Sequence, residues 1–142
     1  QFQAAYDKLW GYCNVVRVGA PYLEDNGSVT LVSGSPARKI KPGQSPLSCV
    51  GASVENLVRC LAVEMAPIRV NVVSPGTIDT PFHAQIKSTK PEVFASWKNN
   101  IMLGRLGQPE EVASVLASFY EIFWPCAELS ILIWSLEIST NF

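Results

Sequence analysis

Apolar residues recur every three or four positions in several parts of this chain, which is the spacing of an amphipathic helix. This pattern predicts a helix over residues 4–20 and a longer helix over residues 46–66. The apolar face of the longer helix carries Val50, Val54, Leu57, Val58, Leu61 and Met65. A short helix is predicted over 92–102. A last helix begins at Pro109, where two following acidic residues suit the positive end of a helix dipole.

Three short runs of apolar and β-branched residues predict buried strands at 27–33, 68–74 and 129–134. Residues 34–46 predict a loop by their glycine, proline and serine content, and residues 75–91 predict a loop with weak helix content. Strands that alternate with helices indicate right-handed crossovers, and therefore a parallel sheet flanked by helices. The fold class is α/β.

The start of the long helix carries strong local signals but little chemistry. Ser45 is predicted to cap the helix, and Pro46 suits its first turn. Residues 46–53 contain no carboxylate, histidine, lysine or tyrosine. Further along, Glu55 and Arg59 lie four residues apart and are predicted to pair on the polar side.

Composition limits the class of protein. The 142 residues favour one domain over 1–142, and 48% of them are hydrophobic. The net charge of −1 gives no reason to expect a nucleic-acid or anionic-membrane partner. Residues 122–136 are mostly apolar, but they are too few and too interrupted for a membrane span.

The cysteines and the single histidine do not form a metal-binding pattern. None of the four cysteines belongs to a CxxC pair, and Cys13 and Cys60 are expected to be buried free thiols. His83 is the only histidine, so no multi-histidine metal site is expected. Residues 1–10 lack the pattern of a signal peptide. These features favour a reducing compartment, and we expect a cytoplasmic protein.

Three segments carry a family resemblance. The longest is "NLVRCLAVEMAPIRVNVVSPGTIDTPF" at 56–82, and "GSVTLVSG" at 27–34 and "GRLGQPEEVAS" at 104–114 support it. Together they resemble the short-chain dehydrogenase/reductase family over roughly residues 4–117. The resemblance implies part of a doubly wound, Rossmann-like parallel sheet that binds NAD(P). Residues 118–142 contain no glycine and depart from the family's pattern, so we interpret them as a divergent tail.

The resemblance implies only one half of a cofactor site. The family holds the cofactor's pyrophosphate on a glycine-rich turn, and the nine glycines here form no such motif. The chain corresponds to the C-terminal half of the family fold, so we expect it to be truncated. The family's nicotinamide loop falls on four residues that the resemblance assigns to cofactor binding: Pro75, Gly76, Ile78 and Thr80.

The resemblance also implies four catalytic positions, and all four depart from the family's residues. Leu47 stands where the family has its proton-transferring tyrosine, and Gly51 stands at the lysine that tunes it. Gly34 falls on the serine position and Lys8 on the asparagine position. A leucine cannot transfer a proton and a glycine cannot tune one, so we expect a catalytically degenerate chain.

Neighbouring residues offer few replacements. Ser33 and Ser35 flank the serine position and are candidate oxygen-orienting hydroxyls, although such serines usually bond local backbone. His83 is usually explained as an exposed loop histidine and Tyr12 by aromatic packing. Surface charge or turn formation is the usual explanation for three other polar residues: Lys39, Lys41 and Asp79.

Two classes of function follow. The first is an NAD(P)-dependent oxidoreductase, or a piece of one, which would act on a small carbonyl or alcohol substrate. The alternative is a non-catalytic interaction module. In either case the resemblance implies a homodimer through the helices at 4–20 and 46–66. The first strand would also leave a bare sheet edge that invites pairing with another chain.

Overall fold

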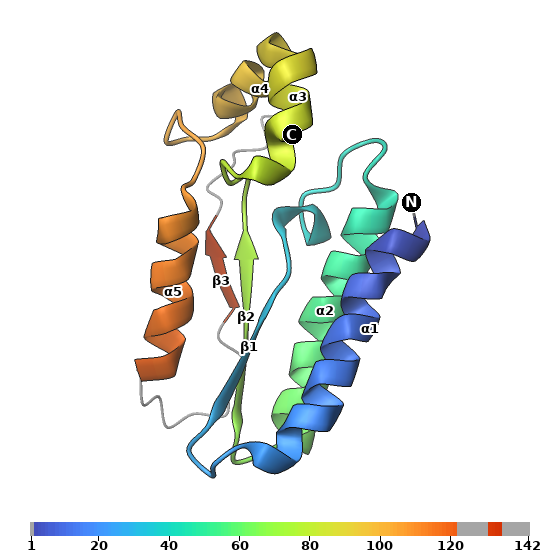
Figure 1. The fold of residues 1–142 in the computed structure, drawn as a ribbon, viewed down its shortest axis with the longest axis vertical. Helices are drawn as coiled ribbons and strands as arrows, with labels where there is room; N and C mark the ends of the chain where they lie inside the picture. Colours follow the sequence, from blue (N-terminus) through green and yellow to red (C-terminus); the bar gives the residue numbers. More distant parts are fainter. Residues whose placement is uncertain (1, 122–130, 135–142) are drawn as a thin grey trace.

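A three-stranded parallel sheet lies between two layers of helices in the computed structural model, which describes residues 2–121 and 131–134 (Figure 1). The strands are β1 (Ser28–Val32), β2 (Arg69–Pro75) and β3 (Ile131–Trp134). They follow the order β1-β2-β3, and both neighbouring pairs are parallel. The predicted α/β architecture is therefore confirmed, and β1 forms one edge of the sheet.

Long helices cover both faces of the sheet. Helices α1 (Phe2–Gly19) and α2 (Ser45–Glu64) lie side by side on one face, and α5 (Pro109–Glu121) lies on the other (Figure 1). Short helical segments lie between the long elements. They are η1 (Ala20–Tyr22), η2 (Ser35–Ala37), η3 (Pro81–His83), α3 (Ala84–Thr89), α4 (Pro91–Ser96) and η4 (Trp97–Asn100).

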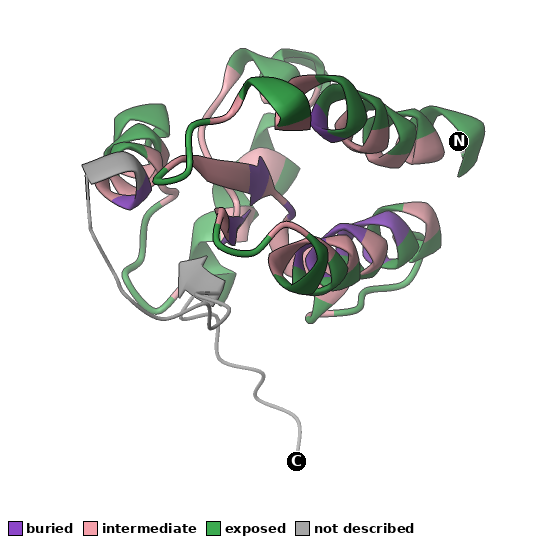
Figure 2. Cartoon of the chain, turned by 90° about the horizontal axis from the view of Figure 1, so that it is seen from below, coloured by how far each residue is buried: buried purple, intermediate pink, exposed green. Residues whose placement is uncertain are grey.

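The core forms where α2 crosses the middle of the sheet. Strand β2 is buried over Val70–Ser74, as expected for a parallel strand that is covered on both faces. In Figure 2, the buried residues of the helices lie on the sides that face the strands. The buried apolar cluster comprises Val16, Leu31, Val50, Val54, Val58, Val70 and Val72.

The observed elements agree closely with the predicted ones. The helices predicted at 4–20 and 46–66 are α1 and α2, and the three predicted strands are β1, β2 and β3. The predicted loops at 34–46 and 75–91 are partly helical, since they contain η2, η3 and α3. Of the tail 118–142, residues 122–130 and 135–142 lie outside the described residues.

Two predictions about α2 are wrong. The helix begins at Ser45, with Gln44 in the N-cap position and no side-chain cap hydrogen bond. Glu55 does not lie on the polar side: only 5% of it is exposed, and its Oε2 pairs with Nε of Arg38 at 3.0 Å. The loop after β1 folds over α2 and brings Arg38 to Glu55, so a tertiary contact replaces the predicted local pair with Arg59.

The thiol prediction is only partly correct. Cys13, Cys49 and Cys60 are free cysteines, but Cys60 is exposed and Cys13 is half-buried. Cys60 lies on the outer side of α2, opposite the buried stripe that includes Val54 and Val58.

Helix α2 is long and apolar enough to span a membrane when judged by length and composition alone. This is weak evidence, because the core helix of a soluble protein can satisfy the same criterion. Here α2 supplies much of the buried cluster, with Val54 and Val58 fully buried.

Candidate functional site

A cavity of about 610 Å³ opens between the N-terminal halves of α1 and α2, beside the turn η2. Its walls include Lys8 from α1, Gly34 after β1, and Leu47 and Gly51 from α2. These are the four positions that correspond to catalytic residues in the resemblance. Residues from three separate elements thus meet at one cavity, which we call the α1–α2 cavity.

Three of these four positions offer no functional group. Leu47 is 56% exposed and carries only a hydrocarbon side chain, while Gly34 and Gly51 carry none. None of them can exchange a proton or orient a substrate oxygen through a side chain.

Lys8 is the exception among the four. Its Nζ donates a hydrogen bond to the carbonyl oxygen of Ser33 at 3.2 Å and lies 5.8 Å from the centre of the Tyr12 ring. Burial of the ammonium group lowers the pKa of Lys8. Sequence reasoning treated Lys8 only as a lost asparagine. Its four-residue spacing from Tyr12, which places both side chains on one face of α1, was the signal that could have identified it.

The turn η2 packs tightly over the lysine position. A Cβ atom at Gly51 would lie 2.9 Å from Cβ of Ala37 and 3.3 Å from Oγ of Ser33. The Ser33 hydroxyl donates to the carbonyl oxygen of Gly51 at 2.9 Å and is buried. The space that a side chain at position 51 would need is therefore filled by the loop that follows β1.

The two candidate serines differ in their surroundings. The hydroxyl of Ser33 is bonded to the backbone of α2, as is usual for a serine at a strand end. Ser35 is the first residue of η2 and lines a second cavity. The structure does not bring the two hydroxyls into one site.

The second cavity has a volume of about 280 Å³ and adjoins the first, since Pro36 and Leu47 line both. Gly76 and Thr77, which follow β2, form part of its wall. We call it the β2-loop cavity. Its other lining residues include Lys39, Lys41, His83, Trp97 and Asn100. Among the described lining residues of both cavities there is no carboxylate.

His83 is not the exposed loop residue that was expected. It is half-buried, and its ring lies 5.1 Å from the Trp97 ring and 5.3 Å from the Phe82 ring, edge to face in both cases. Phe94 lies on the same cluster. The residues after β2 thus fold back onto η4 and build an aromatic wall beside the β2-loop cavity.

The loop that carries the four candidate cofactor residues is fixed by a bridge. Asp79 N–H donates to the carbonyl oxygen of Gly107 at 2.8 Å, and Gly107 N–H donates to that of Thr77 at 3.1 Å. The N–H and carbonyl of Ile78 take no part in these two bonds. A Cβ at Gly107 would lie 2.5 Å from Cδ1 of Ile78, so a larger residue there would make the end of the Ile78 side chain shift.

The four candidates are placed along this loop. Pro75 ends β2, Gly76 lines the β2-loop cavity, and Ile78 forms the bridge. Thr80 precedes η3, where its carbonyl oxygen accepts from His83 N–H at 3.0 Å. Asp79 forms an ion pair with Lys87 of α3, a contact that the sequence pattern did not predict.

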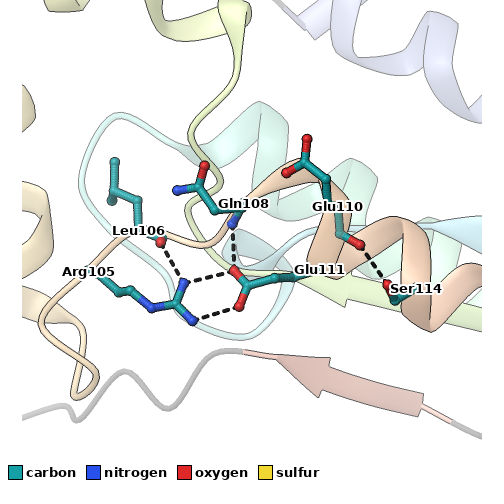
Figure 3. Close-up of polar contacts among 6 residues, drawn as sticks. All are labelled: Arg105, Leu106, Gln108, Glu110, Glu111 and Ser114. Atoms are coloured by element: carbon teal, nitrogen blue, oxygen red, sulfur yellow. Dashed lines mark hydrogen bonds and ion pairs between the residues drawn. The ribbon is translucent and has the colours of Figure 1, made fainter.

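The segment that holds the bridge is itself anchored at the start of α5 (Figure 3). Both carboxylate oxygens of Glu111 accept from the guanidinium of Arg105, at 2.8 and 2.6 Å. Glu111 Oε2 also accepts from the backbone N–H of Gln108 at 2.7 Å, which completes one half of a capping box. The hydrogen bonds from Arg105 and Gln108 lower the pKa of Glu111 to about 2.

The Tyr12 hydroxyl is bonded to the backbone of the sheet. Its hydroxyl donates to the carbonyl oxygen of Val32 at 3.1 Å and accepts from Val32 N–H at 3.3 Å. Val32 belongs to the edge strand β1, so Tyr12 covers part of the edge that was expected to be bare. Within the described residues no group of three or more histidine, cysteine or acidic side chains could hold a metal ion.

The family model and the curated relatives that match this chain belong to one family. The family model for enoyl-(acyl carrier protein) reductase matches residues 2–121. The short-chain dehydrogenase/reductase malC of Malbranchea aurantiaca is 39% identical over 102 residues, which cover 70% of this chain and 39% of malC. The 3-oxoacyl-[acyl-carrier-protein] reductase FabG of Thermotoga maritima is 38% identical over 112 residues, which cover 76% of this chain and 44% of FabG.

Solved structures show the same relationship. A small-chain dehydrogenase crystallised in complex with NADPH superposes with a TM-score of 0.84 at 27% identity, covering 94% of this chain and 62% of that one. The chain spans about two fifths of the length of the curated relatives named above, at 39% and 44%.

Proposed function

Because this chain belongs to the short-chain dehydrogenase/reductase family of NAD(P)-dependent oxidoreductases, we propose that it binds the nicotinamide end of NAD(P) without the family's proton-transfer groups. The proposed cofactor residues are Pro75, Gly76, Ile78 and Thr80. The chain is, in this proposal, one partial Rossmann-like domain over residues 1–142, with 118–142 as its divergent tail. Its three described cysteines are free, which favours a cytoplasmic location.

The cofactor part of the proposal is supported by the loop after β2. Gly76 and Thr77 form one wall of the β2-loop cavity, and the bridge to Gly107 fixes the loop beside it. Glycine permits a flat ring to approach the backbone closely. The backbone groups of Ile78 and the hydroxyl of Thr80 are suited to a carboxamide, and a structural relative of this chain is complexed with NADPH.

One observation carries the degenerate part of the proposal. Lys8, Gly34, Leu47 and Gly51 meet at the α1–α2 cavity, and none of them carries the hydroxyl or phenol of the family pattern. The one group among them that can exchange a proton, the Lys8 ammonium, donates to the carbonyl oxygen of Ser33. General acid–base catalysis needs a group that can give or take a proton within hydrogen-bond reach of the substrate. If the chain does retain activity, the substrate class is a small carbonyl or alcohol.

The decisive test of the cofactor proposal compares NADPH with reduced nicotinamide mononucleotide, which lacks the adenosine half. Trp97 lines the β2-loop cavity, so quenching of tryptophan fluorescence reports binding there. We expect both ligands to bind saturably, with dissociation constants within about threefold of each other, because the chain has no glycine-rich pyrophosphate turn.

Two variants sharpen this titration. Thr80→Val removes the proposed cofactor hydroxyl and should weaken both ligands. Thr89→Val is the matched control, because the Thr89 hydroxyl bonds the Gln85 carbonyl within α3. Absence of saturable quenching by either ligand would refute the cofactor site. If NADPH bound more than tenfold more tightly than reduced nicotinamide mononucleotide, the proposal that only the nicotinamide end is bound would be wrong.

The alternative is a dimerisation or interaction module, and one observation favours it. Trp10, Val15 and Val18 of α1 are all more than half exposed and lie opposite the buried Val16. On α2, Val63 is exposed beside Cys60 and Asn56. Apolar residues gathered on the outer sides of both long helices are typical of an interface.

Sedimentation velocity distinguishes a dimer formed through these helices from a monomer. We expect a homodimer at micromolar concentration, and Val15→Glu should shift it to monomer. Asn99→Glu, an exposed change on η4, is the matched control for one added negative charge. A wild-type chain that sediments as a monomer would contradict the interface.

A further inference from the structure

The α1–α2 cavity has an unusual balance of groups. Its described lining includes apolar side chains such as Ala5, Pro46, Val50 and Phe82, and Lys8 is the sole ionisable residue among them. Its volume of about 610 Å³ lies within the range of small-molecule sites. The cavity therefore combines one cation with an apolar wall.

Lys8 has unused hydrogen-bonding capacity. An ammonium group has three donors, and one of them is directed at the Ser33 carbonyl oxygen. Neither of its described contacts, the Ser33 carbonyl and the Tyr12 ring, carries a full negative charge. Partial burial of the ammonium group lowers the pKa of Lys8, while the residue as a whole stays exposed to solvent.

Three carboxylates on the elements and loops around the cavity have partners other than Lys8. Asp7 accepts from Nε2 of Gln3, and the buried Glu55 pairs with Arg38. Asp79, in the loop after β2, pairs with Lys87. None of these three carboxylates is paired with Lys8, so its ammonium group, on an exposed residue at the rim of the cavity, has no carboxylate partner among the described contacts.

We propose that the α1–α2 cavity binds an organic monocarboxylate, with its carboxylate on Nζ of Lys8 and its apolar body against the side chains of α1, α2 and Phe82. The proposed ligand class rests on the proposed function in one respect, namely that the α1–α2 cavity is where a substrate would bind. A monoanion matches the single cation better than a phosphate, which generally needs several donors or a second charge.

The test is calorimetric titration of the full chain with 4-phenylbutyrate and with its neutral analogue 4-phenylbutanamide, in the absence of any nucleotide. The two probes share one apolar body, so their difference isolates the charge. We expect the carboxylate to bind about tenfold more tightly, which is the effect of one charge-assisted contact. Lys8→Met should abolish this preference, and Lys8→Arg should keep it.

Controls make each outcome informative. Methionine is a good helix former, so Lys8→Met should preserve α1, and Lys98→Met is the matched control for removal of an exposed lysine. Equal binding of the two probes, unchanged preference in Lys8→Met, or no saturable binding of the carboxylate would each overturn the proposal. Carboxylate binding together with a failed nucleotide titration would refute the cofactor proposal alone.

Discussion

Gly51 lacks a side chain at a candidate catalytic position, and it also allows the turn η2 to pack closely on α2. We propose, from the family resemblance, that this position is that of the family's catalytic lysine, and a Cβ atom here would meet Ala37 and the hydroxyl of Ser33. A side chain there would displace η2. In this proposal, a lysine could be placed at position 51 only if the loop after β1 moved away from α2.

We expect Gly51→Ala to destabilise the protein by about 1–3 kcal/mol, because the new Cβ would lie 2.9 Å from that of Ala37. Gly11→Ala is the matched control in α1, where no atom lies within 4 Å of the added Cβ. That change should stabilise the helix by about 0.5–1 kcal/mol. Urea denaturation measures both free energies of unfolding.

The double variant Ala37→Gly/Gly51→Ala removes the facing methyl group and should recover part of the loss. A Gly51→Ala protein as stable as the wild type would show that η2 does not constrain this position.

Glu111 gives a pH-dependent prediction. Its pKa falls from an ordinary value of 4.5 to about 2 through hydrogen bonds from Arg105 and Gln108. The carboxylate is stabilised in the folded state, so its contribution to stability is present above pH 4.5 and is lost as the pH falls toward 2. The difference in unfolding free energy between the wild type and Glu111→Gln should shrink over that range.

Carbon-detected NMR titration of the Glu111 carboxyl measures the pKa directly. Arg105→Met should raise this pKa toward its ordinary value, while Arg17→Met, on α1, should leave it unchanged. An unshifted Glu111 in the wild-type protein would contradict the contacts drawn in Figure 3.

At the scale of elements, hydrophobic spacing was sufficient to locate the long helices and all three strands. The spacing succeeds because α2 and β2 owe their burial to their own apolar pattern. It failed for Glu55, whose partner Arg38 comes from a loop seventeen residues earlier. Local rules consider neighbours on one helix, so they favoured Arg59 and could not anticipate a contact made by a loop.

The edge of the sheet gives a prediction that belongs to β1 and α1 together. The Tyr12 hydroxyl satisfies both backbone groups of Val32 on the open side of β1. Tyr12→Phe should destabilise the protein by about 1–3 kcal/mol, because it leaves these groups without a partner. The uncovered edge should also increase self-association, which dynamic light scattering measures.

Tyr22→Phe is the matched control, because Tyr22 is 85% exposed and should be insensitive to loss of its hydroxyl. If the Tyr12→Phe and Tyr22→Phe proteins had the same free energy of unfolding and the same hydrodynamic size, Tyr12 would have no role in protecting the β1 edge of the sheet.

For the whole molecule, the spacing of the family pattern indicated which positions would share a site. Lys8, Gly34, Leu47 and Gly51 come from separate elements and line one cavity, although the roles of individual residues remain proposals. The sequence could not predict that Lys8 donates to Ser33, or that His83 joins an aromatic cluster. Those features depend on how helices and loops pack, which spacing along one element does not specify.

The central claim is that the scaffold of a nicotinamide site persists without the groups that complete hydride transfer. Absorbance at 340 nm tests this most directly, in a chain first saturated with NADPH as judged by tryptophan quenching, and then mixed with a panel of small aldehydes and ketones. We predict no carbonyl-dependent fall in absorbance above the protein-free blank. A fall whose rate scales with protein concentration would contradict the account.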